Sequence, residues 1–166
     1  MGMVHKRVEG PDPYGSIRVV DIGTFLNISN NLKWSYSHCM QELEKLDKMY
    51  DTSHERIFRK LKLITNAYIS EFNRLVNLSK SGEVSNSIEK RLNKVIRDFN
   101  SDKALNDVLA NAQALILLDR PPEDMGYSQI EQMFDVISAS YKGLLDRITA
   151  LYKESMEQQV RIYRKK

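Results

Sequence analysis

The stretch IEQMFDVISASYKGLLDRITAL, residues 130–151, decides the fold. Its large apolar side chains recur at alternating steps of four and three residues. This spacing places them on one face of a helix and is close to the heptad repeat of coiled coils. The seam consists of Ile130, Phe134, Ile137, Tyr141, Leu144, Ile148 and Leu151. The pattern therefore predicts a long amphipathic helix that buries one face.

Segments before this stretch show the same helical periodicity. Residues 24–120 contain no proline and a single glycine, Gly82, which favours long helices. Whether residues 24–80 form one kinked helix or two stays open. Residues 102–118 have the widest apolar face, which predicts that their helix lies at the centre of the bundle. The expected helix-capping residues are Thr52, Ser85 or Asn86, Asp102 and Ser128. The sequence predicts an all-α, up-down bundle of four to five amphipathic helices with coiled-coil character.

The first 23 residues differ from the rest in composition. Residues 10–16 combine glycine and proline in turn-forming order, and residues 17–22 are rich in β-branched side chains. We expect an extended N-terminal arm over residues 1–23, followed by a single helical domain over residues 24–166. A floppy terminus is the alternative.

Bulk composition excludes several classes of protein. Apolar residues make up 42% of the chain and charged residues 28%, which is typical of a folded domain and not of a disordered chain. No run of 18 apolar residues exists, so no membrane span is predicted. No secretory signal is recognisable after Met1, so we expect a cytoplasmic protein, or a periplasmic or secreted one if a signal peptide has been removed.

Residues with catalytic or metal-binding chemistry do not form a recognisable set. Cys39 lies on an apolar seam, where a thiol is buried and inert, and the adjacent His38 projects about 100° away from it on a helix. His54 has only Asp51 at helical spacing, without a second copy of that pair. We therefore expect no enzyme activity, no cofactor, no metal and no small-molecule substrate.

The net charge of +3 is concentrated in the middle of the chain. If the helices that carry this charge are antiparallel, two basic clusters could merge into one face that binds nucleic acid or an acidic membrane. A merely solvated helix surface is the alternative. The residues concerned are Arg56, Arg59 and Lys60 in the first cluster and Lys90, Lys94 and Arg97 in the second.

A polar stripe runs opposite the apolar seam of residues 25–50. It includes Trp34, the only tryptophan of the chain, and tryptophan is enriched where proteins bind each other. The stripe consists of Asn27, Asn31, Trp34, His38 and Gln41. Together with Tyr14, Val19 and Val20 of the arm, these are the candidate protein-contact residues. The alternative is that Trp34 packs against the arm of its own chain.

One segment resembles the mature N-terminus of pilus-tip subunits of bacterial type IV secretion systems. It consists of Val19-Val20-Asp21, followed by Phe25, Asn27 and a helix that ends near residue 50. In that family a short Val-x-Asp segment precedes a long helix. The resemblance covers about 30 residues, and the family's Thr-Gly after the first helix is missing here. It implies a secreted assembly subunit.

Three hypotheses on function result. The first is a non-enzymatic helical subunit or adaptor that acts through protein partners or self-association in a larger assembly. The alternatives are an anion-surface binder, through the basic residues between 56 and 97, and a secreted pilus-tip-like subunit.

Overall fold

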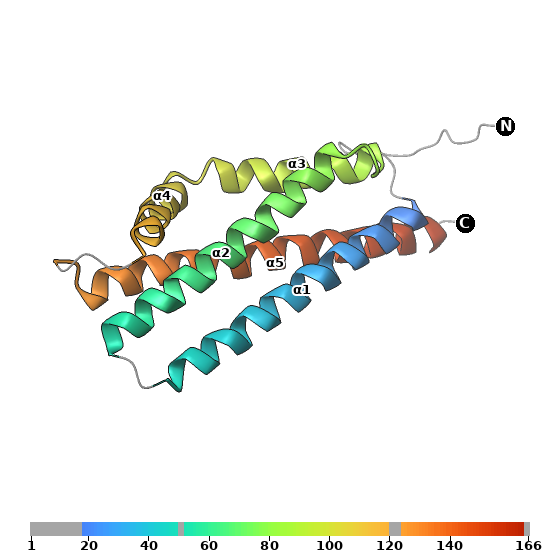
Figure 1. The fold of residues 1–166 in the computed structure, drawn as a ribbon. Helices are drawn as coiled ribbons and strands as arrows, with labels where there is room; N and C mark the ends of the chain where they lie inside the picture. Colours follow the sequence, from blue (N-terminus) through green and yellow to red (C-terminus); the bar gives the residue numbers. More distant parts are fainter. Residues whose placement is uncertain (1–17, 50–51, 120–123, 165–166) are drawn as a thin grey trace.

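A computed structural model describes residues 18–49, 52–119 and 124–164, and within these ranges the chain forms five helices and no strand (Figure 1). The helices are α1 (Val19–Asp47), α2 (Ser53–Lys80), α3 (Asn86–Asn100), α4 (Lys103–Leu118) and α5 (Tyr127–Arg164). The prediction of an all-α bundle is confirmed. Coiled-coil character stays a prediction.

Helix α1 begins at Val19, so the predicted extended conformation is wrong for residues 19–23. The reason is Asp21, whose side chain is 1% exposed. Its carboxylate accepts hydrogen bonds from the backbone N–H of Arg18 at 3.2 Å and from the hydroxyl of Ser85 at 2.9 Å. These bonds cap α1 and fix its first turn to the start of α3, which outweighs the β-propensity of the valines. Residues 1–17, including Tyr14, lie outside the described residues.

Most other helix boundaries follow the capping residues. The side chains of Thr52, Ser85 and Asp102 each accept a hydrogen bond from the backbone N–H three residues later. The question left open for residues 24–80 is also answered, because α1 and α2 are two separate helices. Gly82, with a φ of 74°, follows the end of α2 and adopts the left-handed conformation that glycine tolerates. The cap predicted at Ser128 is wrong, because α5 begins one residue earlier.

The three long helices α1, α2 and α5 lie side by side, and α3 and α4 pack along α2 and α5 (Figure 1). Helix α1 is antiparallel to α5, with the Ser29 hydroxyl 3.2 Å from that of Thr149. Near the middle of the same pair, the rings of Tyr36 and Tyr141 meet edge to face at 5.0 Å. Helices α2 and α5 make the most extensive contacts with the other described helices, so they form the centre of the bundle.

The predicted central position of α4 is wrong. Only Leu105, Ala112 and Leu115 are buried on this helix, and Leu117 at its end is 87% exposed. A wide apolar face shows that a helix carries many apolar side chains, but it does not show how many neighbours cover them. Helix α4 is short and covers one side of the α2–α5 pair.

Candidate protein-contact surface

The stripe predicted on α1 is exposed along its whole length. Asn27, Asn31, Trp34, His38 and Gln41 all lie on the surface. The opposite side of α1 carries the residues that join it to the core, which are Phe25, Ile28, Leu32, Cys39 and Leu43. Because the core residues fix the rotation of α1 about its axis, the stripe faces away from the bundle.

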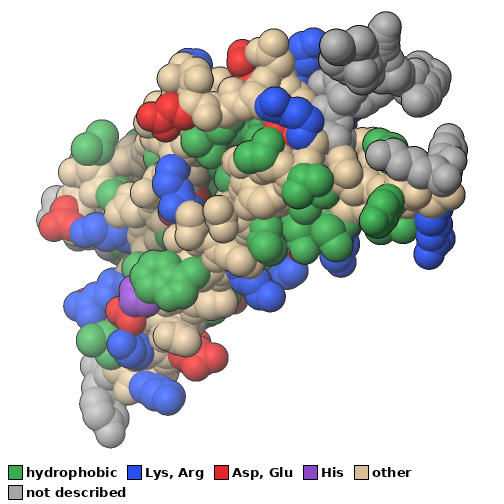
Figure 2. All heavy atoms as spheres, turned by 90° about the vertical axis from the view of Figure 1, so that its right-hand side faces the viewer, with side chains coloured by type: hydrophobic (Ala, Val, Ile, Leu, Met, Phe, Trp, Pro, Cys, Tyr) green, Lys and Arg blue, Asp and Glu red, His purple; other side chains and the backbone are tan. Residues whose placement is uncertain are grey.

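Trp34 stands out in this stripe because it is 70% exposed. Its ring stacks on that of His38 one turn later, with centroids 5.6 Å apart and planes 5° from parallel. The stack holds the indole in one orientation on the helix surface. In Figure 2 the purple histidine lies against a bulky hydrophobic side chain, with lysines and arginines nearby. The alternative in which Trp34 packs against the arm concerns residues 1–17, which are not described.

Val20 extends the stripe toward the start of α1. It precedes Asn27 by seven residues, or two helical turns, so it lies on the same side of the helix, and it is 63% exposed. Val19 beside it is 74% exposed. Both residues were candidates as parts of an extended arm, and the structure instead places them in the first turn of α1.

A second set of exposed apolar side chains lies where α1 begins and α5 ends. Val19 precedes Ser29 by ten residues, and Val160 follows Thr149 by eleven. Because α1 and α5 are antiparallel and Ser29 contacts Thr149, Val19 and Val160 lie at the same height along the helix pair. Figure 2 shows hydrophobic side chains gathered on this face. The exposed apolar residues of this end patch are Val19, Met156, Val160, Ile162 and Tyr163.

Sequence reasoning missed the α5 part of the end patch, because the predicted seam ends at Leu151. A signal was present, since Met156, Val160 and Tyr163 are spaced by four and three residues. These side chains are 42%, 43% and 78% exposed, so the spacing marks an uncovered apolar stripe on α5.

The two basic clusters do not merge. The ring of Phe99 near the end of α3 lies 6.4 Å from that of Phe72, which places α3 beside the second half of α2. Lys60 precedes Phe72 by twelve residues, or about 18 Å along the helix. The clusters therefore lie near opposite ends of α2, and the predicted single basic face is wrong.

Acidic residues also neutralise part of each cluster. Lys60 forms an ion pair with Asp47 at 3.1 Å, and Lys94 forms one with Asp98 at 3.4 Å. Asp98 pairs with Arg147 as well, and the hydrogen bond from Arg147 is the main reason why the pKa of Asp98 lies below its ordinary value. Arg59, Lys90 and Arg97 remain exposed, and Arg56 is half-buried with its guanidinium on the carbonyl of Met49 at 2.6 Å. Binding of nucleic acid or an acidic membrane stays a prediction.

The surroundings of Cys39 make it a poor nucleophile. Its side chain is buried in the core, and burial, with a smaller contribution from Glu42, raises the pKa of the thiol from 9.0 to about 11. The reactive thiolate is therefore scarce near neutral pH. Among the described residues no group of three or more histidine, cysteine or acidic side chains is placed to hold a metal ion. In the same part of the chain, no helix combines the length and apolar character that crossing a membrane requires.

No model of a protein family, no curated protein and no solved structure matches the chain. The resemblance of residues 19–50 to pilus-tip subunits therefore stays a prediction.

Proposed function

We propose that this protein is a non-enzymatic helical subunit or adaptor that acts by binding other protein chains in a larger assembly. The observation that carries the proposal is the Trp34–His38 stack, a large aromatic surface displayed on the outer side of α1. Tryptophan contributes strongly to binding when a partner covers it, and the histidine beneath the indole restricts its motion before binding.

The neighbours of Trp34 on the stripe suit a partner surface of mixed character. Asn27, Asn31 and Gln41 supply hydrogen-bond donors and acceptors around the ring, without fixed charge. A central aromatic side chain surrounded by polar groups is the usual organisation of protein interfaces. The end patch supplies a second, more apolar surface, as an adaptor between two neighbours requires.

The test is to isolate the full chain from the cells that make it and to identify its oligomeric state and its partners. Trp34→Ala is expected to weaken the main contact about 30-fold or more, because loss of a central tryptophan costs about 2 kcal/mol or more. Leu117→Ala is the matched control, since Leu117 on α4 is an apolar residue that is even more exposed than Trp34, at 87%.

Light scattering of the purified chain and quantitative pull-downs of both variants give the answer. Loss of the complex with Trp34→Ala, but not with Leu117→Ala, supports the proposal. A monodisperse monomer that retains no partner would contradict it. A complex that survives Trp34→Ala would remove the α1 stripe from the interface.

A further inference from the structure

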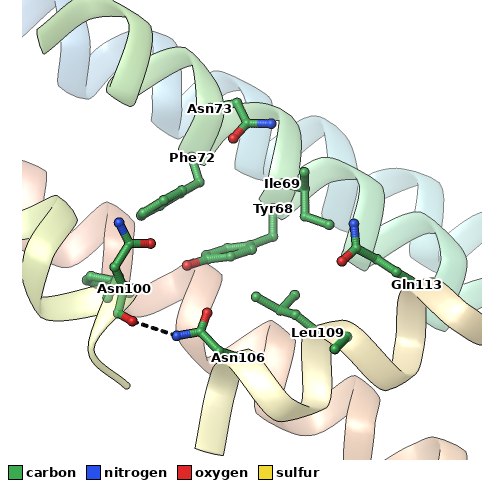
Figure 3. A pocket seen from close by; sticks show the side chains of 10 residues that line it. Tyr68, Ile69, Phe72, Asn73, Asn100, Asn106, Leu109 and Gln113 are labelled. Atoms are coloured by element: carbon green, nitrogen blue, oxygen red, sulfur yellow. Dashed lines mark hydrogen bonds between the residues drawn. The ribbon is translucent and has the colours of Figure 1, made fainter. Parts of the chain in front are cut away.

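A cleft of about 360 Å³ opens between the middle of α2, the end of α3 and the outer side of α4 (Figure 3). Helix α2 contributes Tyr68 and Phe72 to its wall, and Phe99 comes from α3. The cleft lies away from the α1 stripe, because α1 contributes no residue to its lining. Its volume falls within the range of small-molecule sites in proteins.

The hydroxyl of Tyr68 points into this cleft and has no partner there. Figure 3 shows the Tyr68 ring across the middle of the cleft, between Phe72 and Leu109, with its oxygen directed toward Asn100. The residue is 2% exposed, and no group in the described part of the chain forms a hydrogen bond with its hydroxyl. A phenol that is nearly buried favours a hydrogen-bond partner, and a bound ligand could supply one.

Four carboxamides surround the aromatic wall, and they come from three different helices. They belong to Asn73, Asn100, Asn106 and Gln113. Asn106 donates from Nδ2 to the backbone carbonyl of Asn100 at 2.8 Å, which joins α4 to the end of α3 and fixes this side of the cleft. The amides of Asn73, Asn100 and Gln113 have no hydrogen-bond partner among the described residues.

The chemistry of the cleft disfavours a charged ligand, above all an anion. None of the lining residues is charged, so an ionic group would lose its hydration without gaining an ion-pair partner in the wall. Burial and, to a lesser degree, the nearby carboxylate of Asp102 raise the pKa of the Tyr68 hydroxyl, so an anion would also meet like charge. Each carboxamide can both donate and accept hydrogen bonds, and each therefore matches hydroxyl or amide groups. The half-buried ring of Phe72, stacked on the ring of Tyr68 at 5.8 Å, offers an apolar surface for the ring of a ligand.

We propose that this cleft binds a small uncharged ring compound that carries several hydrogen-bond donors and acceptors, of the kind found in sugars and in nucleosides. The Tyr68 hydroxyl and the amides of Asn73, Asn106 and Gln113 contact its polar groups, and the aromatic wall packs against its ring. This activity goes beyond protein contact through α1, and it replaces the expectation that the chain has no small-molecule ligand.

The experiment is an NMR titration of the full-length chain, in which the side-chain amide signals of the cleft asparagines and Gln113 are followed. N-acetylglucosamine and uridine are added separately, up to about 10 mM, since weak sites have millimolar affinity. Uridine monophosphate is the charged counterpart of the second probe. We expect saturable shifts of the cleft amides with one of the two neutral probes, and that probe identifies the ligand class.

Two variants keep the test independent of folding. Tyr68→Phe removes only the hydroxyl and is expected to weaken binding of the neutral probe about 3- to 10-fold. Asn73→Ala removes one carboxamide and is expected to weaken binding by the same factor. Asn66→Ala is the matched control, because Asn66 is an exposed residue of α2 outside the cleft. Silent cleft amides with both neutral probes would overturn the proposal, as would equal weakening by Asn73→Ala and Asn66→Ala or tighter binding of the monophosphate.

Discussion

Asp21 provides the sharpest test of how the bundle is held together. Its carboxylate is buried at the start of α1 and accepts hydrogen bonds from the Arg18 N–H and from the hydroxyl of Ser85, which itself caps α3. Replacement by alanine removes both bonds at once. It also removes a negative charge from the N-terminal end of a helix, where negative charge is stabilising.

The magnitude follows from these contacts. A hydrogen bond to a charged group contributes about 1.5–3 kcal/mol, and the charge at the helix N-terminus contributes about 0.3–1 kcal/mol. Ser85 keeps its bond to the N–H of Ile88, which limits the loss. We expect Asp21→Ala to lower the free energy of unfolding by about 3 kcal/mol, and Asp21→Asn by about 1 kcal/mol, because the amide oxygen can still accept a bond.

Urea denaturation followed by far-UV circular dichroism measures both changes. Asp146→Ala is the matched control, since Asp146 is an exposed carboxylate that forms only a surface ion pair with Lys142. That variant is expected to change the free energy of unfolding by less than about 0.5 kcal/mol. If Asp21→Ala were no more destabilising than Asp146→Ala, residue 21 would not anchor α1 to α3.

Three further predictions concern positions with unusual surroundings. Gly82→Ala is expected to destabilise the protein by about 1 kcal/mol, because the φ of Gly82 is 74°. Gly23→Ala should instead stabilise it by up to about 1 kcal/mol, because Gly23 lies in an open position inside α1. Thermal unfolding compares the two variants, and stability changes of the same sign would refute the assigned start of α1. Tyr141→Phe should raise the melting temperature by about 2–4 °C, because the fully buried Tyr141 hydroxyl has no partner among the described residues, and a marked decrease would show that it has one. Cys39 should react with a thiol reagent at pH 8 only after unfolding, and rapid labelling of the native chain would contradict its burial. Because folding raises the pKa of its thiol from 9.0 to about 11, the free energy of unfolding should fall as the pH rises above 9.0.

Local sequence patterns were sufficient to predict the helices and most of their ends. The alternating steps of four and three residues identify the buried faces, and Thr52 and Asp102 mark helix starts through their own side chains. The start of α1 was placed too late, at residue 24. A local signal was present, since Asp21 accepts a hydrogen bond from the N–H of Arg18, three residues before it. The second bond of Asp21, to Ser85, could not be predicted, because the two residues are 64 positions apart and only the folded chain brings them together.

The candidate sites show the same division. Exposure of the Trp34 stripe follows from its position opposite an apolar seam, so one helix is enough to predict it. The prediction of a single basic face was wrong because helical periodicity does not reveal which part of α2 lies beside Lys90 and Lys94. The cleft was missed for a related reason, since Asn73 and Gln113 belong to different helices and become neighbours only through packing.

Site-specific photo-crosslinking at position 34 tests the central claim, that the outer side of α1 is a protein-contact surface, most directly. A photoreactive amino acid replaces Trp34 in the full-length chain, made in the cells that naturally produce it, and position 117 on α4 serves as the control. A contact surface on α1 predicts a discrete protein adduct from position 34 and none from position 117. Adducts from neither position, or the same diffuse adducts from both, would contradict it.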